Sequence, residues 1–173
     1  MSAATPGQTV GPFFGYALSY EGGPDLVPRG HPDAVRLHGV VLDGAGGPVP
    51  DALLEIRQAD GAGHVPTAGG SLRRDGYTFT GWGRAATDNL GQYSFTNLEP
   101  GAPFIGLTVF ARGLMNRLFT RIYLPDTADP FLLSVQADRR HTLVATRDDQ
   151  GGLRFDIVLQ GDRETVFLTY PGH

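Results

Sequence analysis

Glycine and proline interrupt most of this sequence at short intervals. The 173 residues include 25 glycines and 13 prolines, and most runs between them are short. Both residues are unfavourable inside helices and frequent in turns, so dense interruption favours short strands joined by turns. A chain of this length can bury one real core. We therefore expect one all-β domain.

The strongest strand signal lies between residues 37 and 60. Leu37–Leu42 reads as an extended strand, and Ala52–Gln58 alternates between an apolar and a charged face. Between them, Asp43–Pro48 combines glycines with a proline, a composition typical of a chain reversal. The whole segment is predicted to form a β-hairpin. Because an isolated hairpin is marginal in water, other strands must cover its apolar face.

Further segments supply those strands. Phe104–Arg112 is the best candidate for a central strand, because its residues suit burial on both faces. A second hairpin is predicted over Arg154–Tyr170, with its turn at Gly161 and Asp162. We also predict strands at 77–82 and 118–124, a turn feeding a strand at 87–95, one short helix within 129–140, and an extended or loosely helical segment at 143–147. This pattern predicts a β-sandwich over residues 33–173.

Residues 1–32 have the composition of an extended arm. Many prolines and glycines and almost no periodicity predict that the segment forms no packed element. It nevertheless carries large apolar side chains, namely Val10, Phe13, Phe14, Tyr16, Leu18 and Tyr20. A segment this aromatic normally lies against something. It either covers an edge of its own domain or reaches a partner subunit, and we weigh the two equally.

Charge and composition exclude several classes of function. The formal net charge is -4, the pI is near 5.6 and no basic stripe is present, so no nucleic-acid partner is expected. No apolar run approaches the length of a membrane span, and residues 1–10 lack the features of a signal peptide. We therefore expect a soluble, cytoplasmic protein with no membrane partner. The lack of cysteine excludes disulfides and thiolate metal sites.

Several motifs resemble known sandwich families. GVVLDGAGGPVPDALLEI at residues 39–56, followed by TDNLGQYSFTNLEPG at 87–101, is similar to transthyretin-like sandwiches. LHGVVLDGAGGPVPDALLEIRQAD at 37–60, GRAATD at 83–88 and RFDIVLQGDRETVF at 154–167 resemble segments of the intradiol ring-cleavage dioxygenases. TPGQTVGPFF at 5–14 and FARG at 110–113 are similar to the subunits of that family that bind no iron. The resemblance implies a β-sandwich of the intradiol dioxygenase or transthyretin-like type with an extended N-terminal arm.

The resemblance also implies where iron ligands would stand. Intradiol dioxygenases hold a non-haem Fe(III) with two tyrosines and two histidines. The place of the first tyrosine is Val65 here, and the loop that would carry the second is shortened and has no tyrosine before Phe104. The places of the two histidines are Phe104 and Gly106. None of these offers a lone pair to iron, so the resemblance implies a chain with no metal and no catalytic residue of its own. The histidines are the other candidate ligands, but no two of them have the spacing of a ligand pair. Only His38 lies firmly on a predicted strand. The five histidines are His31, His38, His64, His141 and His173.

The resemblance implies instead that this chain supplies part of the substrate pocket of a partner subunit. In the two-subunit members of the family, the arm of the subunit without iron lies over the Fe(III) of a homologous beta subunit, where protocatechuate and O2 react. Carried over, Thr9, Gly11, Pro12 and Phe13 line the substrate pocket. Arg112 is a candidate to pair with the substrate carboxylate. The alternatives are an ordinary turn at Gly11-Pro12, and an Arg112 that is solvated or pairs with the beta chain.

Two other functions compete with this expectation. A stand-alone transthyretin-like module for binding or structure is supported by the sandwich motif, but such a module has little reason to display Val10, Phe13 and Phe14. A self-sufficient catechol or hydroxyquinol dioxygenase fails on the missing ligands and on the absence of an N-terminal helical dimerisation region. We therefore expect a subunit of an intradiol dioxygenase that has no activity alone.

Overall fold

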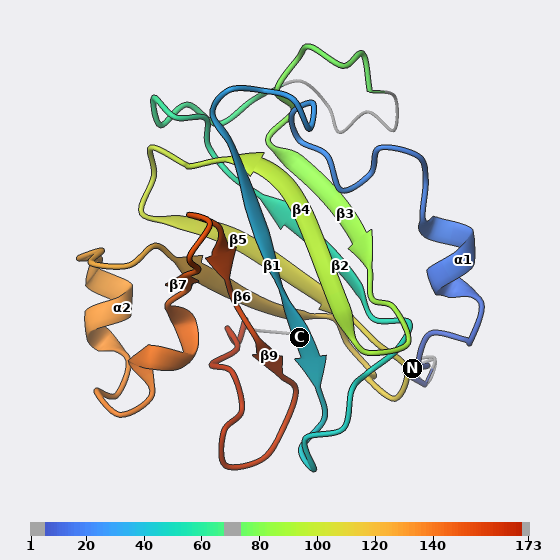
Figure 1. The fold of residues 1–173 in the computed structure, drawn as a ribbon. Helices are drawn as coiled ribbons and strands as arrows, with labels where there is room; N and C mark the ends of the chain where they lie inside the picture. The colour runs from blue at the N-terminus through green and yellow to red at the C-terminus, as the bar shows by residue number, and fades with distance from the viewer. Residues whose placement is uncertain (1–5, 68–73, 171–173) are drawn as a thin grey trace, which may run out of the picture.

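The computed structural model describes residues 6–67 and 74–170 and folds them as two facing β-sheets (Figure 1). The strands are β1 (Ala34–Leu42), β2 (Leu53–Arg57), β3 (Trp82–Ala86), β4 (Gln92–Leu98), β5 (Phe104–Phe110), β6 (Leu118–Tyr123), β7 (Thr146–Arg147), β8 (Leu153–Arg154) and β9 (Ile157–Val158). The first sheet has the order β4-β1-β8-β7, with β9 also paired to β1, and the second has the order β3-β2-β5-β6. The helices are all short: α1 (Phe14–Leu18), α2 (Pro130–Ser134) and the 3-10 helix η1 (Arg140–Leu143). The predicted all-β sandwich is confirmed.

Alternating side chains explain why the two sheets face each other. On β5, every second side chain, at Ile105, Leu107 and Val109, is buried between the sheets. The first sheet contributes Leu37 and Phe95 to the same core, and both are 0% exposed. Each sheet thus buries one face against the other. β5 lies between β2 and β6, so the prediction of a central strand is confirmed.

The first predicted hairpin is wrong, because its two strands lie in different sheets. β1 pairs with β4, whereas β2 pairs with β3 and β5. The turn between them does form, and the Asp43 carboxylate accepts hydrogen bonds from the backbone N–H groups of Ala45 and Gly47. The chain then crosses to the second sheet through Asp51, which has a φ of 64°. Alternation fixes which side of a strand is buried, but it does not identify the neighbouring strand.

The second predicted hairpin, Arg154–Tyr170, is wrong for the same reason. Its turn is present, since Gly161 has a φ of 95° and its carbonyl accepts a hydrogen bond from the Glu164 N–H. However, β8 and β9 pair in parallel with β1 and form no ladder with the segment after the turn. That segment reaches the second sheet, where the Leu168 N–H donates to the Phe119 carbonyl at 2.7 Å. It therefore lies along the edge of β6.

The strand predicted at 77–82 begins only at Trp82. The Asp75 carboxylate accepts hydrogen bonds from the backbone N–H groups of Tyr77 and Thr78 and from the Thr78 hydroxyl. These bonds hold residues 75–78, which precede β3, out of the sheet, because a short acidic side chain competes with the sheet for backbone donors. They also lower the pKa of Asp75 to about 2, and the Thr78 hydroxyl has the largest effect.

The short helix predicted within 129–140 is confirmed as α2, and the 3-10 helix η1 begins only at Arg140, where the predicted range ends. Asp129 caps α2 by accepting hydrogen bonds from the N–H groups of Phe131 and Leu132, and the helix ends where Val135 becomes extended. The strand predicted at 118–124 is confirmed as β6, and the turn and strand predicted at 87–95 are confirmed, with β4 beginning at Gln92. The segment at 143–147, predicted to be extended or loosely helical, contains the last residue of η1 and then the two-residue β7.

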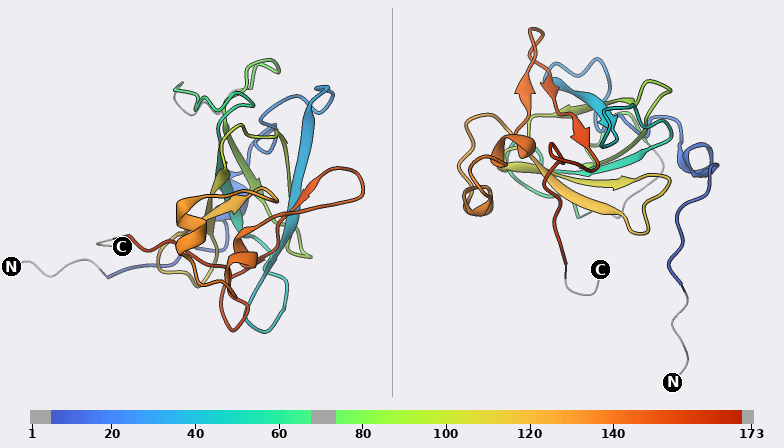
Figure 2. Two further views of the ribbon diagram at one scale, coloured as in Figure 1. Left: turned by 90° about the vertical axis from the view of Figure 1, so that its left-hand side faces the viewer. Right: turned by 90° about the horizontal axis from the view of Figure 1, so that it is seen from below.

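The N-terminal arm has two parts that differ in packing. Leu26 is 2% exposed, and its N–H donates to the Thr96 carbonyl of β4, so residues 20–27 belong to the sandwich. The expectation of an arm with no packed element does not hold for this part. Residues 6–18 include α1 and lie at the periphery of the sandwich (Figure 2), where the Leu18 carbonyl accepts a hydrogen bond from Arg84 Nη1 at 2.9 Å. No helix within residues 6–67 and 74–170 is long and apolar enough to cross a membrane.

Candidate functional site

The predicted substrate-site residues lie where the arm passes the turn between β5 and β6. Thr9 Oγ1 accepts a hydrogen bond from the Gly113 N–H at 2.7 Å, so the arm is anchored next to Arg112. Arg112 Nη2 lies 3.1 Å from the Asp51 carboxylate, and the arginine side chain is 51% exposed. A half-exposed ion pair of this kind contributes little stability. The guanidinium can therefore exchange Asp51 for another carboxylate at small cost.

Gly11, Pro12 and Phe13 are all exposed on this chain. A Cβ atom at Gly11 would meet no heavy atom within 4 Å, and Phe13 is 76% exposed. The structure thus brings Thr9 beside Arg112 but does not enclose the five predicted residues in a cavity. They form an exposed edge, which we call the arm edge: Thr9, Gly11, Pro12, Phe13 and Arg112.

The places that the resemblance gives to iron ligands lie elsewhere, around the other end of β5. Phe104 and Gly106 line a cavity of about 410 Å³ on the outer face of the second sheet. A phenyl ring and a hydrogen atom cannot ligate a metal, and Val65 is an exposed loop residue. In the described part of the chain, no group of three or more histidine, cysteine, aspartate or glutamate side chains is placed to hold a metal ion. The residues present therefore do not fit ferric iron.

Two arginines that the sequence analysis missed flank Gly106 in this cavity. Gly106 pairs with Arg57 of β2 on one side and with Arg121 of β6 on the other, so the three residues stand in a row across the sheet. Cross-strand neighbours project to the same face, so both guanidinium groups flank the open position above Gly106. Only the strand register could have revealed this row, because its members are far apart in the sequence.

Aromatic rings hold Arg121 in place. Its guanidinium carbon lies 4.2 Å from the ring centroid of Phe104 and 4.6 Å from that of Phe131, and its Nη1 lies 3.7 Å from Asp129. The Tyr123 hydroxyl donates to Asp129 at 2.7 Å. This bond, followed by bonds from backbone N–H groups, lowers the pKa of Asp129. Asp129 therefore stays ionised at neutral pH and continues to attract Arg121.

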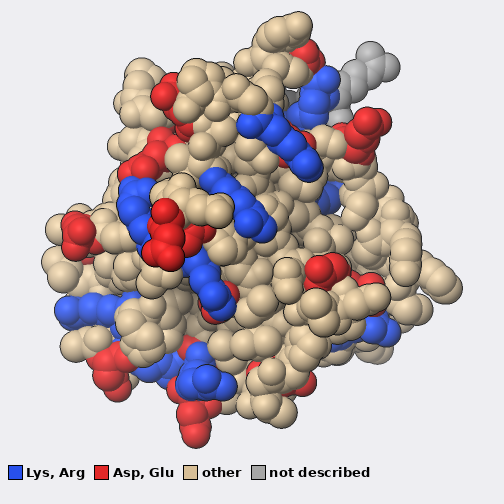
Figure 3. Space-filling view, viewed as in Figure 1, with Lys and Arg blue, Asp and Glu red and all other residues tan. Residues whose placement is uncertain are grey.

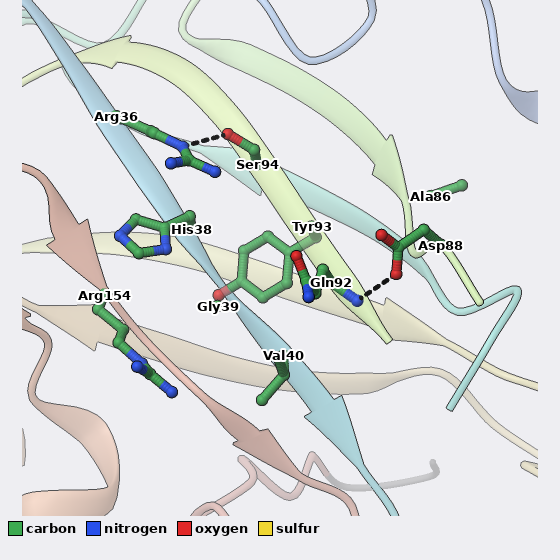
Figure 4. Close-up of a pocket in the computed structure, with 10 residues that line it drawn as sticks. All are labelled: Arg36, His38, Gly39, Val40, Ala86, Asp88, Gln92, Tyr93, Ser94 and Arg154. Carbon is green, nitrogen blue, oxygen red and sulfur yellow. Dashed lines mark hydrogen bonds between the residues drawn. The ribbon is translucent and has the colours of Figure 1, made fainter. Parts of the chain in front are cut away.

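A second hollow, of about 440 Å³, lies on the outer face of the first sheet (Figure 4). Its lining is mainly polar, and its cationic groups have partners. Arg154 Nη2 lies 2.9 Å from Asp156, and Arg36 Nε donates to the Ser94 hydroxyl at 3.0 Å. Charges of both signs are mixed over this side of the molecule (Figure 3). The hollow has the composition of a solvated sheet surface.

Within residues 6–67 and 74–170, the histidines do not form a replacement site for iron. His38, predicted to lie on a strand, does lie on β1, where its Nε2 is 2.9 Å from Asp148. Its hydrogen bond has the largest effect in lowering the pKa of Asp148. His64 lies 3.6 Å from Asp60 in a loop, and His31 accepts a hydrogen bond from a nearby backbone N–H. His173 lies outside the described residues.

Comparison with known proteins supports the resemblance. A family model described as "Dioxygenase" matches residues 10–105, which is more than half of the 173-residue chain. The protocatechuate 3,4-dioxygenase alpha chain of Burkholderia cepacia is 42% identical over 191 residues, covering 95% of this chain and 96% of that protein. The beta chain of protocatechuate 3,4-dioxygenase from the same organism is 32% identical over 165 residues, covering 79% of this chain and 69% of that one.

Solved structures show the same architecture. The dioxygenase domain of a dioxygenase carbohydrate-binding protein fusion from Streptomyces sp. SirexAA-E superposes with a TM-score of 0.57 at 24% identity, covering 92% of this chain and 99% of that domain. At this identity, the likeness concerns the fold alone. The family model and the alpha chain together cover nearly all of the sequence. The chain therefore belongs to the intradiol ring-cleavage dioxygenase family.

Proposed function

We propose that this chain is the alpha subunit of a protocatechuate 3,4-dioxygenase, a subunit that holds no iron of its own. It pairs with a homologous beta subunit that holds Fe(III). The complex uses O2 to open the ring of protocatechuate between its hydroxyl-bearing carbons, which gives 3-carboxy-cis,cis-muconate. The relatives include both an alpha and a beta chain, which supports a partnership of two homologous subunits. The activity belongs to the complex and not to this chain alone.

One observation carries the proposal: β5 lacks metal-ligating side chains, while the arm edge beside its other end is exposed. Phe104 and Gly106 occupy the ligand places on the strand. Phe13 and Tyr16 on the arm are 76% and 79% exposed, although large aromatic side chains are normally buried against other protein surface. A chain that lacks its own iron site but presents an aromatic arm is suited to complete the site of another subunit.

The arm edge can bind and orient a substrate without taking part in bond breaking. Gly11 and Pro12 present a flat backbone surface with little side chain, against which an aromatic ring can lie. Phe13 adds an apolar ring at the same edge. The Thr9 hydroxyl accepts from Gly113, and its own proton is available to a substrate oxygen. The planar fork of Arg112 matches the geometry of a carboxylate.

Expression with and without the beta subunit tests the proposal. The lone chain is expected to fold, to contain no stoichiometric iron and to show no protocatechuate-dependent uptake of O2. The complex is expected to contain iron and to consume O2. Stoichiometric iron together with O2 uptake in the lone, folded chain would overturn the proposal. A monodisperse monomer that does not associate with the beta subunit would also overturn it and would favour the stand-alone module.

Arg112→Ala in the complex tests the contact with the substrate carboxylate. Loss of a hydrogen bond between charged groups, worth about 1.5–3 kcal/mol, predicts a rise of roughly 10- to 100-fold in KM for protocatechuate. Iron content is expected to stay unchanged. Arg29→Ala is the matched control, because Arg29 is another exposed arginine paired with an aspartate. Unchanged kinetics in Arg112→Ala would remove this residue from the site.

Asp51→Asn separates a substrate contact from a purely structural ion pair. Asparagine tolerates the positive φ of 64° at this position, so the backbone is expected to keep its conformation. The variant breaks the pair with Arg112 but leaves the guanidinium in place. If Arg112 acts on substrate, only Arg112→Ala raises KM strongly. If the ion pair alone matters, both variants show the same change.

A further inference from the structure

The cavity over Gly106 has the features of a ligand site made by this chain itself. On the outer face of the second sheet, the residues Trp82, Arg57, Gly106 and Arg121 are register neighbours on β3, β2, β5 and β6. All four line the same cavity of about 410 Å³. This volume lies within the range of about 300–1,000 Å³ that is typical of small-molecule sites. Four adjacent strands therefore contribute to one cavity.

Gly106 keeps the floor of the cavity open. A Cβ atom added there would meet only the Arg57 carbonyl oxygen, at 3.4 Å, which is an ordinary contact distance. The position has no positive φ that would demand glycine. The space above Gly106 is therefore accessible to a ligand, and a larger side chain could fill it without straining the backbone.

Aromatic side chains form the walls. Four aromatic side chains line the cavity: Trp82, Phe104, Phe119 and Tyr170. Phe119 and Tyr170 pack edge to face, with ring centroids 5.4 Å apart and an interplanar angle of 87°. Such walls favour a flat, apolar ring, because aromatic groups stack on or edge against one another.

The two arginines give the cavity a positive charge that its own carboxylate does not cancel. Glu55 also lines the cavity, but Arg84 donates to Glu55 Oε1 from both Nε and Nη2, at 2.9 and 2.6 Å. Arg121 has Asp129 at 3.7 Å, outside the lining. Arg57 has no carboxylate within 4.0 Å among the described residues; its hydrogen bond to the Pro66 carbonyl is long, at 3.4 Å. An anion would therefore complete the electrostatics of the cavity.

We propose that this cavity binds a planar aromatic monocarboxylate. Arg57 and Arg121 hold the carboxylate, and the ring lies over Gly106 between the aromatic walls. Recognition rests on charge and ring shape, and ring hydroxyls contribute little, because the ligand places at Phe104 and Gly106 offer no metal centre. The inference goes beyond the proposed function, since it concerns a ligand held by this chain's own side chains without iron.

Equilibrium binding of benzoate tests this site, in the full chain and in its complex with the beta subunit. Trp82 is the only tryptophan of the chain and lines the cavity, so its fluorescence reports binding to the chain alone. In the complex, calorimetric titration counts benzoate sites per alpha–beta pair. We expect saturable binding to the chain with a Kd on the order of 10⁻⁴ to 10⁻³ M, a common range for a small ligand with one charged anchor. Benzamide, which has the same shape without the charge, is expected to bind at least tenfold more weakly.

Three variants of this chain locate the binding. Gly106→Leu fills the cavity and is expected to abolish binding, and to remove one benzoate site from the complex, with little change in melting temperature. Arg57→Gln is expected to weaken binding about tenfold or more, because a charged partner is lost. Arg36→Gln is the matched control: Arg36 also projects from the outer face of a sheet, but in the mainly polar hollow (Figure 4), and binding is expected to stay unchanged.

Several outcomes would overturn the proposal. One is the absence of saturable binding, and another is binding that neither Gly106→Leu nor Arg57→Gln affects. Equal affinity for benzamide and benzoate would show that the arginines do not recognise the ligand. Binding to the lone chain that disappears in the complex would mean that the partner polypeptide occupies the cavity. A complex that is active but fails these tests leaves the proposed function standing, so the two proposals fail separately.

Discussion

The two ends of β5 differ in how much of a binding site this chain forms by itself. The start of the strand lies beside Arg121 and the cavity over Gly106, and its end lies beside Arg112 and the arm edge. At the start of the strand, Arg121 is fixed between Phe104 and Phe131, and Gly106 opens a cavity. Beyond the end of the strand, Arg112 is 51% exposed and has one carboxylate partner. The first region is a cavity lined by this chain's own side chains, and the second is an exposed edge.

The difference lies in what each region contains. The cavity over Gly106 has a lining of aromatic side chains and arginines from four strands of one sheet. The arm edge has no cavity of its own and depends on a surface supplied by another molecule. Under the two proposals, one strand serves two kinds of recognition, one internal to the chain and one between chains.

Removing the arm should have the largest effect and should act on only one side of this comparison. Deletion of residues 1–13 is expected to lower the kcat/KM of the complex by at least about 100-fold, since small misplacements of a substrate already cost that much. The fold should remain, because the exposed residues 6–9 and 11–13 contribute no core side chain. Activity is measured with protocatechuate, and folding by thermal melting. A fully active truncated complex would show that the arm edge is not part of the pocket.

Arg121 and Arg112, at opposite ends of β5, should differ in their contribution to the free energy of unfolding. Arg121→Met is expected to lower the free energy of unfolding by about 1–3 kcal/mol, because it removes two cation–π contacts and leaves the partly buried Asp129 without its cation. Arg112→Met is the matched control and is expected to cost less than about 1 kcal/mol. Denaturant unfolding of both variants measures the difference. Equal losses would contradict the view that only Arg121 is built into the fold.

Acid should weaken the Arg121 region through Asp129. The pKa of Asp129 is lowered in the folded protein, first by the Tyr123 hydroxyl, so its ionised form stabilises the fold above its ordinary pKa of about 3.9. This stabilisation is lost as the pH falls through the lowered, folded-state pKa. Asp129→Asn should therefore be less stable than wild type at pH 7, and the gap should shrink below about pH 4. Denaturant unfolding at pH 7, 5, 4 and 3 measures the gap, and a constant gap would contradict the assignment.

The smallest effect is expected where the arm touches the turn after β5. Thr9→Val removes the acceptor for the Gly113 N–H, so hydrogen exchange of that amide should become faster. The free energy of unfolding should change by less than about 0.5 kcal/mol, because the contact lies at the surface. Thr146→Val, which alters another exposed threonine, is the control. Unchanged exchange at Gly113 would show that the arm is not anchored by Thr9.

Strand identity could be predicted from the sequence because it depends on local alternation. The buried series at Ile105, Leu107 and Val109 defines β5 within a few residues of sequence. Strand pairing depends on distant partners. Both predicted hairpins contained the right turns, yet β2 pairs with β3 and β5, and the segment after Gly161 runs along β6. Two neighbouring amphipathic strands can bury their apolar faces by facing each other across a core as well as by pairing in one sheet.

The same distinction between local and distant information applies to the candidate site residues. Thr9 and Arg112 came from the resemblance, and the structure places them beside one another through Gly113. Arg57 and Arg121 could not be found in this way, because their proximity exists only once β2, β5 and β6 are in register. The hydrogen bond from Tyr123 to Asp129, the residue that caps the start of α2, was also hidden, since it depends on the approach of β6.

The coverage of the second sheet along both borders limits how a partner can attach. The Gly23 carbonyl accepts from the Arg84 N–H outside β3, and the Leu168 N–H donates to Phe119 outside β6. Segments of the same chain thus occupy backbone groups that a foreign strand would need for β-augmentation. Another subunit is left to recognise this sheet through its side chains or through the arm. Assembly by side-chain recognition favours a partner of defined shape over indiscriminate, fibre-forming growth from strand to strand.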